Sequence, residues 1–160
     1  MGAQELSTML WRERSLLDLL TFKLEEEQLL LTAGKTRWIQ HATREVEQVV
    51  QQMQVASLER DMAVSTVAEE WGLPVDAGLR DIAAAAPEAW KDIFHSHLKA
   101  MSDQTRQIAA LRDANEQFLR AAARSGQETI ASIQREPGTY DASGRPQATA
   151  GGSSLLDQKL

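Results

Sequence analysis

The chain has 160 residues and a formal net charge of -6, which suits a single domain with a real core. The negative charge argues against nucleic acid or an anionic membrane surface as the main partner. The absence of cysteine excludes disulfides and thiolate metal sites. The first residues lack the basic region and apolar core typical of a signal peptide, so we do not expect one. No apolar run approaches the roughly 20 residues that span a membrane. We therefore expect a soluble, cytoplasmic protein without membrane insertion.

A leucine-rich segment predicts a first helix over about 5–33. On a helical wheel, Trp11, Phe22 and Leu29 gather almost opposite the leucine seam. A third helix, a dimer partner or a client would have to cover this second apolar face, and we expect the second helix to meet it. Within the seam, Leu10, Leu17, Leu24 and Leu31 recur at heptad spacing, and Leu6 and Leu20 fill the intervening positions.

Glycine and proline mark the boundaries of the later helices. Gly34 either ends or kinks the first helix, and a second helix follows over about 36–71. Gly72-Leu-Pro74 stops that helix, because proline lacks the amide hydrogen and disfavours helix in the residue before it. Asp76 is the predicted N-cap of a short helix. Pro87, as a first-turn proline, opens a last long helix that runs to about Arg135.

Strand signals are nearly absent, so the predicted fold is all-α. We expect an elongated antiparallel helical bundle or coiled-coil hairpin of about three long helices plus a short helix. The predicted bundle domain covers 1–135. The Gly/Ser/Pro-rich segment 136–160 is predicted to be a flexible, disordered tail, because its composition cannot bury enough area to offset backbone ordering.

The chain lacks the residue patterns of a catalytic, cofactor or metal site. Ala33-Gly-Lys-Thr36 looks like the end of a phosphate-binding loop, but Leu29 stands where that loop needs another glycine. His95 and His97 point in different directions on a helix, and His97 is expected to be a satisfied residue at the bundle edge. Glu25-Glu-Glu27 fans around the helix as a solvated face plus one seam glutamate. No nucleophile with a base appears, so we expect neither an enzyme nor a bound cofactor.

Several polar and aromatic residues fall at positions that a bundle core would occupy. Glu13 and Glu27 lie in the leucine seam, where they either tune the register or leave room for a partner. Asn115 lies on the apolar stripe of the last helix and must be hydrogen-bonded if it is buried. It is either a register-setting residue or a hydrogen-bonding group for a partner helix. The tryptophans are expected to fill the core: Trp11, Trp38, Trp71 and Trp90.

The order and spacing of several short pieces resemble the FlgN-type flagellar export chaperones. The resemblance covers most of the chain from about residue 10 onward. The matching pieces are Leu10–Leu31, Trp71-Gly-Leu-Pro74, Leu79-Arg-Asp-Ile82, Pro87-Glu-Ala-Trp90, Leu111-Arg-Asp-Ala-Asn-Glu-Gln-Phe-Leu119, Tyr140-Asp-Ala-Ser-Gly144 and Ser154-Leu-Leu-Asp157.

The resemblance implies a cytosolic chaperone that binds hook-associated (hook–filament junction) proteins, masks their terminal segments and delivers them to the type III export gate. In that family pattern Tyr140 is the candidate contact with the export gate. Leu155-Leu-Asp157 would be either a second docking element or a pseudo-client that covers the groove. The client side is the C-terminal half of the last helix, which carries over to Leu111, Asn115, Phe118, Leu119, Ala122, Ile130 and Ile133.

Two other classes of protein compete with the chaperone. A generic coiled-coil scaffold or oligomerisation module would form a stable symmetric oligomer and hold no client. A helical-bundle enzyme is disfavoured by the missing catalytic residues. The chaperone is expected to be a monomer or weak dimer with an exposed apolar groove.

Overall fold

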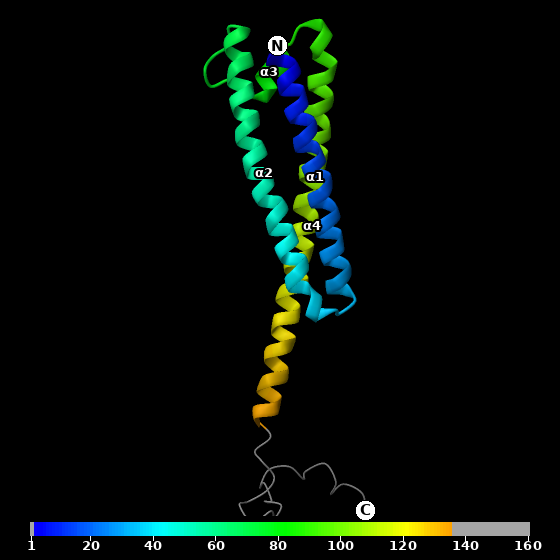
Figure 1. Ribbon diagram of the computed structural model, residues 1–160. Helices are drawn as coiled ribbons and strands as arrows, with labels where there is room; N and C mark the ends of the chain where they lie inside the picture. The colour runs from blue at the N-terminus through cyan, green and yellow to red at the C-terminus, as the bar shows by residue number, and fades with distance from the viewer. Residues whose placement is uncertain (1, 136–160) are drawn as a thin grey trace, which may run out of the picture. The chain divides into compact units, whose positions relative to one another are not determined.

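The computed structural model describes residues 2–135, and within them every regular element is helical (Figure 1). The helices are α1 (Gly2–Thr32), α2 (Thr36–Glu70), α3 (Leu79–Ala85) and α4 (Glu88–Arg135). The predicted all-α helical bundle is therefore confirmed. The chain divides into two units, Met1–Leu119 and Arg120–Leu160, and the described residues of the second unit are 120–135. The predicted tail 136–160 lies outside the described residues, so the proposed division of the chain at 135 stays a prediction.

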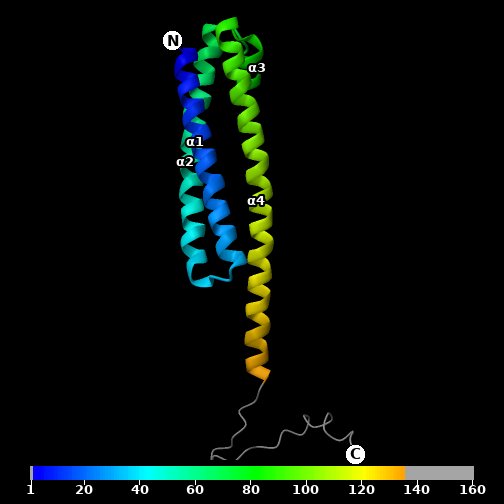
Figure 2. The same cartoon turned by 90° about the vertical axis from the view of Figure 1, so that its right-hand side faces the viewer.

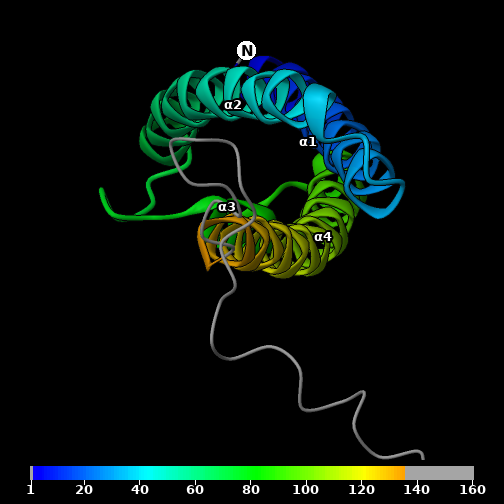
Figure 3. The same ribbon diagram turned by 90° about the horizontal axis from the view of Figure 1, so that it is seen from below.

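In the first unit, α2 runs antiparallel to α1, and the first part of α4 runs parallel to α1 (Figures 1 and 2). Arg12 Nη1 lies 2.6 Å from Glu59 Oε2, and Lys23 Nζ lies 2.6 Å from Glu45 Oε2. Residues late in α1 thus meet residues early in α2. Along α4 the order is the same as in α1, because Gln104 bonds near the middle of α1 and Asn115 bonds farther along it. Seen from below, α3 lies between α2 and α4 (Figure 3).

Both helix ends that the sequence placed at glycine are left-handed caps. Gly34 and Gly72 have φ values of 65° and 66°, a conformation that costs a side-chain-bearing residue energy. The Lys35 amide donates to the Leu30 carbonyl at 2.9 Å, and the Leu73 amide donates to the Ala68 carbonyl at 2.8 Å. These bonds satisfy carbonyls that a helix end would otherwise leave free. Gly34 therefore ends α1 rather than kinking it.

The starts of α3 and α4 differ slightly from the prediction. The N-cap of α3 is Gly78, so the prediction of Asp76 was wrong. Asp81 explains the shift, because its carboxylate accepts the Gly78 amide hydrogen at 2.8 Å and caps the helix from inside its first turn. Pro87 stands just before α4, and its carbonyl accepts the first helical bonds from Trp90 and Lys91.

The core of the first unit consists of two apolar clusters. The larger one joins all four helices around Phe94, with Leu6, Val67 and Ile82 also fully buried. Trp71 and Trp90 flank Phe94, with ring centroids 6.2 Å and 5.7 Å away. The second cluster contains Leu20, Leu24 and Val49, packed against half-buried Met53, Ile108 and Leu111.

The second apolar face of α1 is open, so the prediction that the second helix covers it was wrong. Trp11, Phe22 and Leu29 are 55%, 55% and 70% exposed. Helix α2 packs on the seam side of α1, through Leu20 and Leu24, and leaves the opposite side uncovered. Trp11 and Trp38 likewise do not fill the core, whereas Trp71 and Trp90 pack against it. The Trp11 ring instead contacts the His97 ring in a T-shaped arrangement, with centroids 5.0 Å apart.

His97 lies deeper than the bundle edge where the sequence placed it. It is 1% exposed, and it contacts Ser7 and Arg14 of α1. The Arg14 guanidinium has only hydrogens to donate, so Nδ1 accepts from it and Nε2 carries the proton toward Ser7 Oγ, each at 3.4 Å. Burial lowers the pKa of His97 below its ordinary value, and the Arg14 charge lowers it further. Folding therefore favours the neutral form of this imidazole.

Stability should depend on pH through His97. Below about pH 6.5 the unfolded imidazole takes up a proton that the folded one resists, so acidification favours the unfolded state. His97→Gln should remove this contribution, which is at most about 1.4 kcal/mol per pH unit. Urea unfolding at pH 7.5 and 5.5 measures the change in unfolding free energy. His95→Gln is the control, because exposed His95 bonds only its own helix. An equal pH slope in wild type and His97→Gln would contradict the assignment.

Candidate functional site

The residues predicted to bind a client divide between the two units. In the first unit, Leu111 is half-buried against the smaller core cluster and Asn115 is 2% exposed. Phe118 is 41% exposed and Leu119 is half-buried. Leu111 and Asn115 thus belong to the bundle interior, whereas the Phe118 side chain is exposed.

Asn115 is held by a hydrogen-bonded layer that joins three helices. Its side-chain amide donates to the Leu24 carbonyl at 2.9 Å and to Glu27 Oε2 at 3.0 Å. The other carboxylate oxygen of Glu27 accepts from Thr43 Oγ1 at 2.7 Å. Both amide hydrogens of Asn115 are therefore used inside the bundle, which favours the register-setting interpretation.

The described part of the second unit, 120–135, is one helical segment with an open apolar side. Every side chain from 121 to 130 is exposed, and Ile130 and Ile133 are 58% and 67% exposed. At about 100° per residue, Ala122, Gly126, Ile130 and Ile133 share one side of the helix. Arg124, Gln127 and Glu128 lie on the other side. A side chain at Gly126 would meet nothing within 4 Å, so the apolar side is unobstructed there.

The first unit also contains a groove that sequence reasoning missed. It has a volume of about 1210 Å³ and follows one side of α4 beside α3, with Leu79, Leu98, Met101 and Thr105 among its lining residues. Arg60 of α2 lines it as well. Helix α3 has only seven residues, so it flanks only part of this side of α4. No local sequence pattern reports how far such a neighbour extends.

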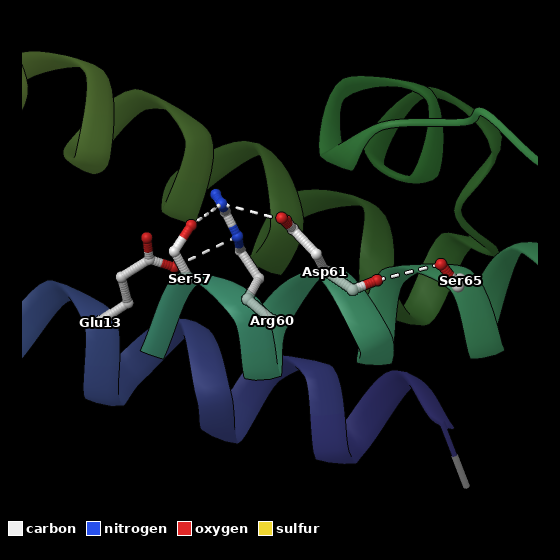
Figure 4. A network of polar contacts seen from close by, with 5 residues as sticks. All are labelled: Glu13, Ser57, Arg60, Asp61 and Ser65. Carbon is white, nitrogen blue, oxygen red and sulfur yellow. Dashed lines mark hydrogen bonds and ion pairs between the residues drawn. The ribbon is translucent and has the colours of Figure 1, made fainter. Parts of the chain in front are cut away.

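Arg60 is fixed in a polar network instead of extending freely into solvent (Figure 4). Its Nε lies 3.4 Å from Glu13 Oε2, and its Nη2 donates to Ser57 Oγ at 2.7 Å and contacts Asp61 Oδ1 at 3.1 Å. Glu13 is 4% exposed. Burial raises the pKa of the Glu13 carboxyl, and the Arg60 charge opposes that rise. Both seam glutamates therefore have polar partners on α2, and both fit a role in setting register.

The described residues give no support for a metal site or a membrane-spanning helix. No group of three or more His, Asp or Glu side chains in 2–135 could hold a metal ion. Among the described helices, none combines the length and the apolar character needed to cross a membrane. Tyr140 and Leu155-Leu-Asp157 lie outside the described part of the chain, so their predicted roles stay predictions.

Comparison with known proteins identifies one family. A family model described as "FlgN protein" matches residues 1–148. No curated protein and no solved structure matches the chain.

Replacing the Asn115 amide by a carboxylate should break the buried layer. Asn115→Asp places a second carboxylate where the amide now lies 3.0 Å from Glu27 Oε2. We expect the unfolding free energy at pH 7.5 to fall by about 3 kcal/mol, because two buried like charges repel and lose their donors. Gln117→Glu, the same change at an exposed position of α4, should be nearly silent in urea unfolding. Wild-type stability in Asn115→Asp would show that the layer does not hold the bundle.

Proposed function

The chain is a member of the FlgN family of flagellar export chaperones, and from this premise we propose that its clients are hook-associated (hook–filament junction) proteins. It acts in the cytoplasm, masks the terminal segments of these clients and delivers them to the type III export apparatus. The family match over residues 1–148 is the support for the client class. The structure adds an argument about where a client segment binds.

A terminal segment that becomes an amphipathic helix in a filament must be kept from associating early. Before assembly it has an apolar face and no partner, which favours aggregation. An open apolar helix side can pair with such a segment through residues at i, i+3, i+4 and i+7. The chaperone and the client then cover each other's apolar surface until export.

The observation that carries the proposal is the exposed apolar side of 120–135. Ala122, Ile130 and Ile133 lie on it, and nothing in the described part of that unit covers the two isoleucines. Burying one isoleucine side chain contributes about 1.5–3 kcal/mol, so this pair is a substantial binding element. We propose these residues as the client-binding face.

The remaining predicted residues take different parts in the proposal. In the first unit, exposed Phe118 and half-buried Leu119 are proposed client contacts in their own right. Leu111 and Asn115 support client binding indirectly, because their contacts hold α4 against the rest of the bundle. Tyr140 remains the proposed contact with the export gate.

A coiled-coil scaffold without a client is the alternative. Such a scaffold would cover its apolar sides by self-association and would bind no hook-associated protein. Membership in a chaperone family favours the client-binding function. Titration with a client separates the two.

Replacing both isoleucines by aspartate should abolish tight client binding. The probe is a full-length hook-associated protein from the same organism, titrated calorimetrically against the full chain. Ile130→Asp with Ile133→Asp should weaken binding by about 100-fold, because two apolar contacts are replaced by desolvated charges.

The matched control carries the same charges on the opposite side of the segment. Ala121→Asp with Ser132→Asp should change the Kd by less than about threefold, and circular dichroism should show similar helicity in both variants. Equal weakening by both pairs would contradict the proposed face. No binding by the wild-type chain to any hook-associated protein would overturn the client class itself.

A further inference from the structure

Helix α2 carries an apolar stripe that no described residue covers. Val55, Leu58 and Met62 are 53%, 67% and 72% exposed. Their spacing of three and four residues puts them on one side of the helix, almost opposite buried Ala56 and Val67. Three large apolar side chains in one row on a bundle surface are typical of an interaction site.

The same spacing continues in both directions through exposed polar residues. Gln51, Gln48 and Arg44 precede Val55, while Ser65 and Glu69 follow Met62. Together these eight residues, 44, 48, 51, 55, 58, 62, 65 and 69, form what we call the α2 stripe. An alternation of four and three residues over this length is the pattern of a coiled-coil seam.

The two ends of the α2 stripe carry opposite charges that are free within the bundle. Arg44 and Glu69 are exposed, and neither forms an ion pair with another described residue. In a parallel pair of α2 helices, Arg44 would face Arg44 and Glu69 would face Glu69. In an antiparallel pair, each Arg44 faces a Glu69. The charges at the two ends therefore favour the antiparallel orientation over the parallel one.

We propose that the α2 stripe binds a second copy of this chain in an antiparallel, twofold-symmetric dimer. The twofold axis passes between Val55 and Leu58. Val55 then faces Leu58 of the second copy, Gln51 faces Met62, Gln48 faces Ser65, and Arg44 faces Glu69. The stripe is thus complementary to itself, as an isologous interface requires. Binding a client helix would not require the two ends of the α2 stripe to be complementary to each other.

The dimer is weak because the contact is small. Each copy contributes three large apolar side chains, with glutamines before them and a serine after them, which places the interface at the low end of the range for specific contacts. The dissociation constant is on the order of 10–100 μM, so the chain is monomeric when dilute and dimeric when concentrated. The opposite-charge pairs lie at the exposed ends, so salt weakens the dimer.

Sedimentation velocity on the full chain without any client tests the proposal. Leu58→Asp should raise the dimer Kd at least about tenfold, because it places two charges beside the symmetry axis, each facing Val55 of the other copy. Leu29→Asp is the matched control: Leu29 is 70% exposed on α1, outside the stripe, and its substitution should leave the Kd unchanged.

Charge reversal tests the orientation. Arg44→Glu and Glu69→Arg should each raise the Kd about tenfold, because each creates two like-charge contacts across the axis. The double variant Arg44→Glu with Glu69→Arg should return the Kd to within about threefold of wild type.

Three outcomes would overturn the dimer. They are a monomeric wild type at concentrations up to about 1 mM, a dimer that survives Leu58→Asp, and a double variant that is no tighter than the single ones. If Leu58→Asp instead weakened binding of a full-length hook-associated protein, the α2 stripe would be a client surface. None of these results depends on the isoleucine face of 120–135, so the dimer proposal and the client proposal are tested independently.

Discussion

The buried carboxylate of Glu27 is the constraint on which the rest of the bundle depends. A polar group buried in a core must have hydrogen-bond partners, and Glu27 takes one from α2 through Thr43 and one from α4 through Asn115. Sliding any of the three helices by one turn would leave these groups unpaired. The Arg60 and Glu13 contact and the His97 and Ser7 contact add further fixed points along the same helices. Polar contacts thus set the register, and the apolar clusters around Phe94 and Leu24 supply the burial.

A fixed register also decides which apolar residues stay outside. Once the seam of α1 faces α2, Phe22 and Leu29 must point away from the core, and Leu58 and Met62 do the same on α2. In the second unit, Ile130 and Ile133 are exposed along one side of the helical segment. A chaperone benefits from this division, because an exposed face such as that of Ile130 and Ile133 can bind and release an apolar segment while the core remains packed.

Helix positions and the main seam were predictable from the sequence, because they follow from local patterns. Heptad leucines identified the buried side of α1, and Gly34, Gly72 and Pro87 marked ends that the structure places within a residue or two. The solvent exposure of Trp11, Phe22 and Leu29 was not predictable from such local patterns. A helical wheel shows which residues share a side, but it does not show which sides the neighbouring helices leave uncovered. The partners of Arg60 and Asn115 come from distant parts of the chain, so their contacts follow only from the packing.

The central claim is that a client is held on the helical segment 120–135 while the bundle core is unchanged. Amide hydrogen exchange, read in the free chain and in its complex with a full-length hook-associated protein, tests this most directly. The account predicts fast exchange in 120–135 of the free chain, since every side chain from 121 to 130 is exposed, and strong added protection there in the complex. Amides around Phe94 should be slow in both states, because that residue is fully buried. Added protection confined to α1 and α2, with 120–135 unaffected, would contradict the account.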